Sequence, residues 1–163
     1  MIIRKAKDED AKRIAKVHVD SWRTTYKGIV PDLFLEMLNY EEREEIWKKA
    51  IPTGSVFVAE NETGEIIGFA NGGKERSGQY PGYVGELYAI YLLEAFQGQG
   101  IGSLLVKKVM EYLKEIGLFP MIILALADNP ACKFYEANGG KRIGTEEVEI
   151  GGKKLTEVVF GWK

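Results

Sequence analysis

The sequence predicts a mixed α/β fold that forms one domain over residues 1–163. Segments with strand-like and helix-like spacing follow one another in the order strand, helices, three strands, helix, strand, helix and two strands. A chain of 163 residues has the length of one domain and can bury a substantial core. We find no internal repeat, low-complexity stretch or linker that would divide it.

The first half of the chain supplies a strand, a group of helices and a hairpin. Ala11, Ile14 and Ala15 recur at helical spacing, and Asp8 is expected to cap the helix that carries them. Glycine and polar residues mark the turns between the later segments. The expected elements are a strand at 2–5, a helix ending before Gly28, helices near 32–38 and 41–50, hairpin strands at 56–59 and 66–70, and a mobile loop from Gly72 to Gly82.

The second half alternates strands and helices around a glycine-rich loop. Gly117 suits the end of one helix, and Pro130 suits the first turn of the next. The apolar run 121–126 is typical of a strand covered on both faces. The expected elements are a strand at 84–93, a helix at 102–117, a strand at 121–126, a helix at 130–138 and a closing hairpin that turns at 151–153.

Composition excludes several classes of function. The formal net charge is −2, so no strong attraction to nucleic acid or to an anionic membrane is expected. No apolar run approaches the ~20 residues that cross a bilayer, and no secretory signal opens the sequence. Cys132 is the single cysteine, so an internal disulfide is impossible. These observations predict a cytoplasmic protein.

The strongest local signal is the loop from Gln97 to Gly102, between a predicted strand and a predicted helix. Its glycines allow a sharp turn, and the following helix offers unpaired N–H groups and the positive end of its dipole. Together they predict a phosphate or pyrophosphate site. The loop lacks the lysine of a Walker A motif, and Ser103 or Leu105 stands where a Rossmann fingerprint needs its third glycine.

The loop fits a different pattern, Gln/Arg-x-x-Gly-x-Gly/Ala, through Gln97, Gly100 and Gly102. A strand-like segment at 86–92 precedes it, and the run 129–136 with two glycines follows downstream. In these segments, and in the order of its elements, the chain resembles the GNAT superfamily of N-acetyltransferases. One mild departure is a lysine, after the second glycine, where phenylalanine is commonest.

The resemblance implies the GNAT acyl-CoA N-acyltransferase fold, in which helices flank a central mixed, mostly antiparallel sheet. It also implies acetyl-CoA as cosubstrate, no metal, and transfer of the acetyl group to a primary amine of a small molecule or peptide. In such enzymes the pantetheine arm lies along the fourth strand and the pyrophosphate lies on the loop. The residues that the resemblance places at the cofactor are Ile90, Tyr91, Leu92, Gln97, Gly98, Gln99, Gly100, Ile101, Gly102, Ser103, Asn129, Lys133 and Phe134.

Two catalytic residues are implied by the same comparison. Tyr135 matches the tyrosine near the thioester sulfur, where a phenol can donate a proton to the leaving thiolate. A lysine-like amine has a pKa of about 10.4, so only about one molecule in 2,500 is a free nucleophile at pH 7. A general base would therefore help, and Glu86 is the candidate. Each side chain also has a structural interpretation: Tyr135 as a core anchor and Glu86 as a solvent-facing strand residue.

The acceptor site is expected at the front of the chain. His18, Trp22 and Tyr26 lie on or just after the first helix and are candidates for lining it. Packing in an aromatic core is at least as good an interpretation of Trp22 and Tyr26 and a better one of His18. Cys132 has no evident partner to lower its pKa, so we expect direct attack by the amine rather than an acetyl-cysteine intermediate.

Two other functions stay open at this point, a non-catalytic acyl-CoA sensor of the same fold and a nucleotide-phosphate enzyme of another class. A homodimer is also conceivable, because members of this fold frequently pair through their last strands. The apolar residues that would form such an edge are Val158, Val159, Phe160 and Trp162.

Overall fold

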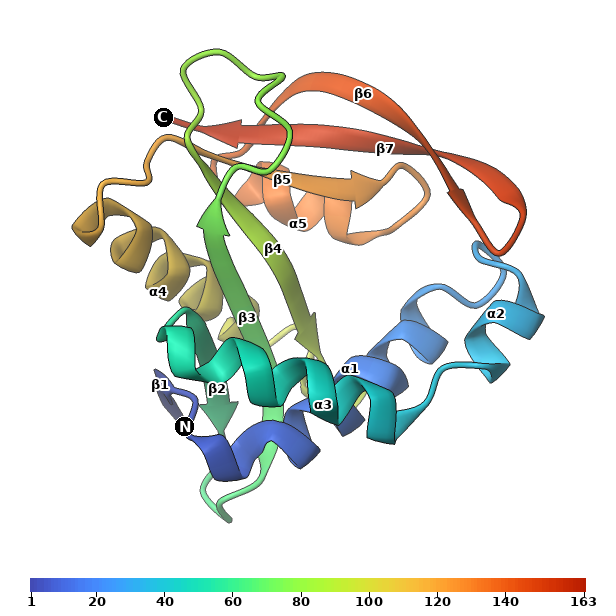
Figure 1. Cartoon of the computed structure of the whole chain (residues 1–163), viewed down its shortest axis with the longest axis vertical. Helices are drawn as coiled ribbons and strands as arrows, with labels where there is room; N and C mark the ends of the chain where they lie inside the picture. The colour runs from blue at the N-terminus through green and yellow to red at the C-terminus, as the bar shows by residue number, and fades with distance from the viewer.

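Seven strands join in one sheet in the order β1-β2-β3-β4-β5-β7-β6, in a computed structural model that describes all 163 residues (Figure 1). The strands are β1 (Ile2–Lys5), β2 (Val56–Glu60), β3 (Ile66–Lys74), β4 (Gly85–Leu92), β5 (Met121–Leu126), β6 (Lys141–Ile150) and β7 (Lys153–Trp162). The helices are α1 (Ala11–Thr25), α2 (Asp32–Glu36), α3 (Tyr40–Ala50), α4 (Ile101–Glu115) and α5 (Ala131–Ala137). The predicted order of elements is confirmed.

All neighbouring strands are antiparallel except β4 and β5, which run parallel. The predicted mixed, mostly antiparallel sheet is therefore confirmed. β4 and β5 pair only at Gly85–Met121 and Glu86–Ile122, after which they diverge. The far part of β4 keeps its pairing with β3 but has no strand on its other side. This fork is the feature that positions the site.

Helices cover both faces of the sheet (Figure 1). α4 and α5 pack on one face through a core that includes Leu105, Val109 and Tyr135. α1 and α3 pack on the other face over β2 and β3, where Trp47 meets Phe69. A smaller cluster joins α1 and α2 to the ends of β5 and β7. None of the helices is both long and apolar enough to cross a bilayer.

Two local predictions in the first half are wrong. Asp8 does not cap α1; it begins a 3₁₀ turn, Asp8–Asp10, that precedes the helix. Asp10 is buried there, and its carboxylate accepts hydrogen bonds from the Lys7 amide at 2.8 Å and from Arg4 at 2.7 Å. The expected loop also begins later, because β3 continues to Lys74.

Gly72 explains why β3 extends into a stretch that looked like a loop. A Cβ at this position would lie 2.8 Å from both the Val109 side chain and the Glu86 carbonyl oxygen. Glycine therefore permits close packing of α4 on the strand rather than mobility. The connection between β3 and β4 spans 75–84 only.

The apolar residues near the end of the chain are core, and the predicted exposed edge is wrong. β7 lies between β5 and β6, so neither of its sides is free. Val159 and Phe160 are fully buried, and Val158 and Trp162 are 4% and 5% exposed. The free edges of the sheet are β1 and β6. Val158, Val159, Phe160 and Trp162 therefore offer no free edge through which two copies could pair.

Candidate active site

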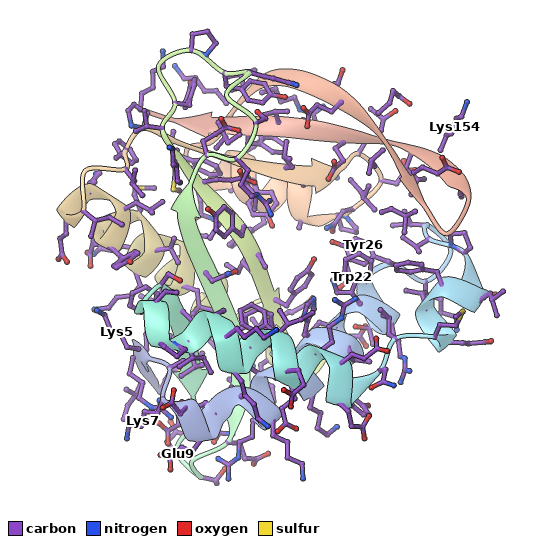
Figure 2. All side chains as sticks on the ribbon, in the orientation of Figure 1. Lys5, Lys7, Glu9, Trp22, Tyr26 and Lys154 are labelled. Carbon is purple, nitrogen blue, oxygen red and sulfur yellow. The ribbon has the colours of Figure 1, made fainter.

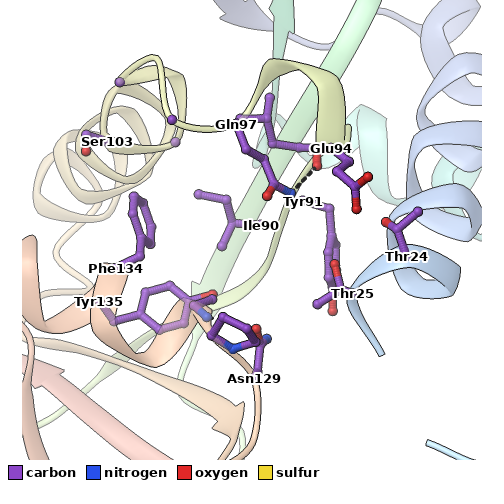
Figure 3. Close-up of a pocket in the computed structure, with 16 residues that line it drawn as sticks. Thr24, Thr25, Ile90, Tyr91, Glu94, Gln97, Ser103, Asn129, Phe134 and Tyr135 are labelled. Atoms are coloured by element: carbon purple, nitrogen blue, oxygen red, sulfur yellow. Dashed lines mark hydrogen bonds between the residues drawn. The ribbon is translucent and has the colours of Figure 1, made fainter. Parts of the chain in front are cut away.

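The fork between β4 and β5 opens into a cavity of about 480 Å³ (Figure 3). Its walls come from the end of β4, the glycine-rich loop, the first turn of α4, the start of α5 and the last turn of α1. The lining residues are Thr24, Thr25, Ile90, Tyr91, Leu92, Glu94, Gln97, Gly98, Gly100, Gly102, Ser103, Asn129, Pro130, Ala131, Phe134 and Tyr135. Eleven of these belong to the predicted set, so the structure brings most of that set to one place.

The glycine-rich loop presents main-chain groups at one end of the cavity. Gly98 and Gly100 have φ values of +78° and +83°, which residues with a side chain rarely adopt. A Cβ on either would meet no protein atom within 4 Å. No side chain caps α4, and its first hydrogen bond runs from the Leu104 amide to the Gly100 carbonyl oxygen. The amides before Leu104 are therefore free donors at the positive end of a 15-residue helix. This arrangement suits an anion.

Gln97 ties this loop to the strand beside it. Its Nε2 donates a hydrogen bond to the Leu92 carbonyl oxygen at 3.0 Å, drawn as a dashed line in Figure 3. Gly102 seats the loop on α5, because a Cβ there would lie 3.0 Å from the Phe134 ring. The loop is thus held between β4 and α5 in the conformation that exposes its amides.

Tyr135 lies on the wall opposite Tyr91 (Figure 3). Its ring packs against Phe160 and Trp162 at centroid distances of 5.7 and 6.4 Å, and the residue is 5% exposed. No hydrogen bond within the chain involves its hydroxyl. Burial raises the pKa of Tyr135 well above the ordinary tyrosine value. The phenol therefore stays protonated at neutral pH and keeps its proton beside the cavity.

A hydroxyl network joins the base of the cavity to α1. The Tyr26 and Tyr91 hydroxyls lie 3.1 Å apart, and Asn129 Nδ2 donates to the Tyr26 hydroxyl at 3.5 Å. Asn129 is 6% exposed and also accepts a hydrogen bond from the Ala131 amide at 2.9 Å. Burial raises the pKa values of both Tyr26 and Tyr91, so both hydroxyls remain protonated.

Four of the residues predicted to bind the cofactor or to act in catalysis do not line the cavity. Ile101 is 4% exposed and belongs to the core, whereas Gln99 and Lys133 are exposed outside the cavity. Glu86 is only 2% exposed, so its interpretation as a solvent-facing residue is wrong. Its carboxylate accepts a 2.6 Å hydrogen bond from Arg76 Nη2 in an ion pair. Whether Glu86 is a base stays a prediction.

The three acceptor candidates form an aromatic cluster behind Tyr91 rather than the cavity lining. His18 stacks on Tyr91 with 5.7 Å between centroids, and its Nδ1 accepts a 3.2 Å hydrogen bond from Trp47 Nε1. Burial and then the charge of Arg43 lower the pKa of His18 to about 4, so the ring is neutral at pH 7. Trp22 and Tyr26, whose rings lie 4.5 Å apart, extend this cluster between α1 and the C-terminal hairpin (Figure 2).

Sequence reasoning missed five lining residues. Thr24 and Thr25 occupy the last turn of α1, and Glu94 lies two residues past the end of β4. Pro130 and Ala131 directly follow the predicted Asn129, and this adjacency was the available signal for them. The sequence held no signal for the two threonines, because their approach to β4 depends on how α1 packs on the sheet. No group of three or more His, Cys, Asp or Glu side chains gathers in a metal-binding arrangement.

Comparisons with known proteins agree with this geometry. Residues 19–139 match the model of the Acetyltransferase (GNAT) family. The chain is 49% identical over 160 residues to the uncharacterized N-acetyltransferase YuaI of Bacillus subtilis, covering 98% of this chain and 91% of that protein. It shares its fold with the ribosomal-protein-alanine N-acetyltransferase of Brucella melitensis (TM-score 0.79, 24% identity, 99% of each chain). It also shares its fold with the PaiA N-acetyltransferase of Thermoplasma acidophilum in complex with coenzyme A (TM-score 0.74, 23% identity, 96% of each chain).

Proposed function

The chain belongs to the acetyltransferase (GNAT) family, and from this premise we propose that it transfers the acetyl group of acetyl-CoA to a primary amine of a small molecule or peptide. Membership of the family, together with a relative 49% identical over nearly the whole chain, makes the protein an N-acetyltransferase. The proposal adds the acceptor class, the residues that hold the cofactor and their roles. The observation that carries it is the fork between β4 and β5, which leads to the glycine-rich loop.

The two ends of the cavity suit the two parts of coenzyme A. The unpaired side of β4 from Ile90 to Leu92 offers main-chain groups to the amides of a pantetheine arm, as an added strand would pair. The free amides at the start of α4 suit the pyrophosphate. The positive φ of Gly98 and Gly100 keeps these amides turned outward with no Cβ in the way. The Thermoplasma relative, which shares the fold, was solved with coenzyme A.

The same cavity supports direct attack by the amine. An acetyl group placed beside Ile90 and Tyr91 has main-chain N–H groups near its carbonyl oxygen, and these can stabilise the charge that develops there. Tyr135 on the opposite wall donates a proton to the departing sulfur. Cys132 is buried and does not line the cavity, and burial raises the pKa of its thiol. We therefore propose that no acetyl-cysteine forms. A single cysteine also suits a reducing compartment, and we propose that the enzyme works in the cytoplasm.

Calorimetric titration with acetyl-CoA, coenzyme A, NADH and ATP tests the cofactor assignment. We expect micromolar binding of the two coenzyme A species only. Thiol release with spermidine, lysine, phenethylamine and an alanyl peptide then tests transfer. Preference for NADH or ATP contradicts the proposal. Binding of acetyl-CoA without thiol release from any amine indicates a non-catalytic sensor.

A matched pair of glycine variants tests the loop itself. Gly100 and Gly117 have φ values of +83° and +76°, and a Cβ added to either would have no neighbour within 4 Å. Alanine at either site should lower the free energy of unfolding by about 1 kcal/mol, because both need the left-handed conformation. Only Gly100→Ala places a methyl group in the proposed phosphate site. We expect it to raise the Kd for coenzyme A about tenfold or more, while Gly117→Ala leaves the Kd unchanged. Equal Kd values in the two variants would place the phosphates elsewhere.

A further inference from the structure

Glu157 on β7 carries a carboxylate that has no role so far in the packing of the fold or in the lining of the cavity. It stands opposite Leu126 of β5 and Glu146 of β6 in the strand register. Directly opposed residues share a face of the sheet. Leu126 packs with Tyr26 in the cluster below α1 and α2, so the Glu157 side chain lies on that face.

The register also places Glu157 at the open end of the fork. β4 and β5 part after the pair Glu86–Ile122, and Leu126 is four residues past Ile122, as Ile90 is past Glu86. Glu157, opposite Leu126, is thus level with the part of β4 that lines the cavity.

Tyr26 links this position to the cavity. Its hydroxyl contacts the hydroxyl of Tyr91 and the amide of Asn129, both of which line the cavity. The charge of Glu157 contributes to the raised pKa of Tyr26, which follows mainly from burial. The carboxylate therefore lies near the hydroxyl network at the base of the site, on the side away from the glycine-rich loop.

Glu157 differs from Glu86 in having no partner. Arg76 binds the Glu86 carboxylate at 2.6 Å, whereas no hydrogen bond or ion pair involves the side chain of Glu157. Burial, followed by the charges of Glu146 and Glu86, raises the pKa of Glu157, and Arg76 opposes the rise. The charge of Glu157 also contributes to the raised pKa values of Tyr26 and of Tyr80, which lies in the 75–84 loop. A half-buried carboxylate without a bound partner is free to accept a proton.

We propose that Glu157 takes the first proton from the protonated acceptor amine, an inference that rests on the proposed function. The ammonium group loses one proton to Glu157, which holds it during the transfer and releases it to water afterwards. The neutral nitrogen then attacks the thioester carbonyl carbon, so that the N–C bond forms and the C–S bond breaks. Tyr135 protonates the sulfur, and the second proton leaves the nitrogen and restores the phenol of Tyr135. The products are the acetamide, coenzyme A thiol and one proton.

Glu157→Gln tests this step through the pH dependence of kcat/KM, measured with the fastest amine among those tested for thiol release. In the wild type, kcat/KM should rise with pH and reach a plateau once Glu157 is ionised, because the protonated amine is the form used. The variant must use the free amine, so its kcat/KM should rise about tenfold per pH unit up to the amine pKa of about 10. At pH 7 we expect a loss of about 10²- to 10³-fold that shrinks as the pH increases.

Glu149→Gln is the matched control, because it removes the same charge from an exposed position on the neighbouring β6. It should leave the profile unchanged, and acetyl-CoA affinity should be unchanged in both variants. A loss that is equal at every pH, or no loss, overturns the assignment of Glu157 and leaves the proposed function intact. A wild type that acetylates no amine overturns both.

Glu157→Asp covers the case in which Glu157→Gln does not fold, as judged by circular dichroism. It keeps a carboxylate but changes its position and pKa. We expect the plateau to remain and the pH at which it begins to shift. An unchanged onset in a folded Glu157→Asp enzyme assigns the plateau to another group and overturns the inference.

Discussion

The two sides of the cavity are built in different ways. On the side proposed to bind coenzyme A, one stretch from Ile90 to Ser103 supplies the strand edge, the loop and the helix start, and 129–135 supplies the opposite wall. On the side proposed to bind the acceptor, the end of α1, the hydroxyl network and β7 come from segments far apart in the sequence. A ligand that is held by main-chain groups requires glycines at particular positions, and these can be recognised in the sequence. A pocket lined by side chains is assembled only by tertiary packing.

The largest effect that this comparison predicts concerns Tyr135, the proposed acid on the coenzyme A side. Tyr135→Phe keeps the ring that packs on Phe160 and Trp162 but removes the proton donor. We expect kcat to fall about 10²-fold or more, while the Kd for acetyl-CoA and the melting temperature change little. Stopped-flow thiol release and calorimetry measure the two quantities separately.

Tyr112→Phe is the control for this substitution, because Tyr112 packs on Phe57 away from the cavity. It should leave kcat unchanged. If Tyr135→Phe keeps the wild-type kcat, Tyr135 is a core anchor, and the sulfur must take its proton from water.

How far the sequence predicts each side follows from the same difference. Glycine spacing predicted the loop, and apolar periodicity predicted nearly every strand and helix, because both are local properties of the chain. The stretch around Gly72 looked like a loop because its glycine is required by close packing against α4, about 40 residues away in the sequence. The run from Val158 to Phe160 misled us because only the strand order shows that β7 is internal.

The acceptor side shows a second kind of limit. The Arg76–Glu86 ion pair and the partnerless Glu157 have no sequence signal, since a charged residue on a strand looks the same whether or not it finds a partner. His18, Trp22 and Tyr26 were expected to line the acceptor site, but all three pack behind Tyr91, an outcome that depends on tertiary contacts.

The next prediction concerns stability on the acceptor side. His18 has a pKa lowered to about 4 in the folded state, so the unfolded chain binds a proton more readily below pH 6.5. His18 therefore costs stability as the pH falls from 6.5 toward 4. His18→Asn keeps an acceptor for Trp47 Nε1 but does not titrate. Between pH 7 and 4.5, the wild type should lose about 2 kcal/mol more unfolding free energy than His18→Asn, as measured in urea.

This variant also sharpens the assignment of Glu157. Because His18 is neutral and does not line the cavity, its replacement should leave the onset of the kcat/KM plateau where it is. If the onset moves in His18→Asn, the histidine titrates during turnover. The rise of kcat/KM below the plateau is then caused by ionisation of His18 rather than of Glu157.

The smallest expected effect belongs to Cys132, which separates direct attack from a covalent route. The thiol donates to the Leu126 carbonyl oxygen at 3.4 Å, lies outside the cavity, and has a pKa raised mainly by burial. We therefore expect it to act as a protonated core residue rather than as a nucleophile. We expect Cys132→Ala to change kcat by less than about twofold, with a cost in stability of about 1 kcal/mol for the lost sulfur atom. A complete loss of thiol release in a folded Cys132→Ala protein, together with a stable acetyl-cysteine in the wild type, would show that the acetyl group passes through the enzyme and that the amine does not attack the thioester directly.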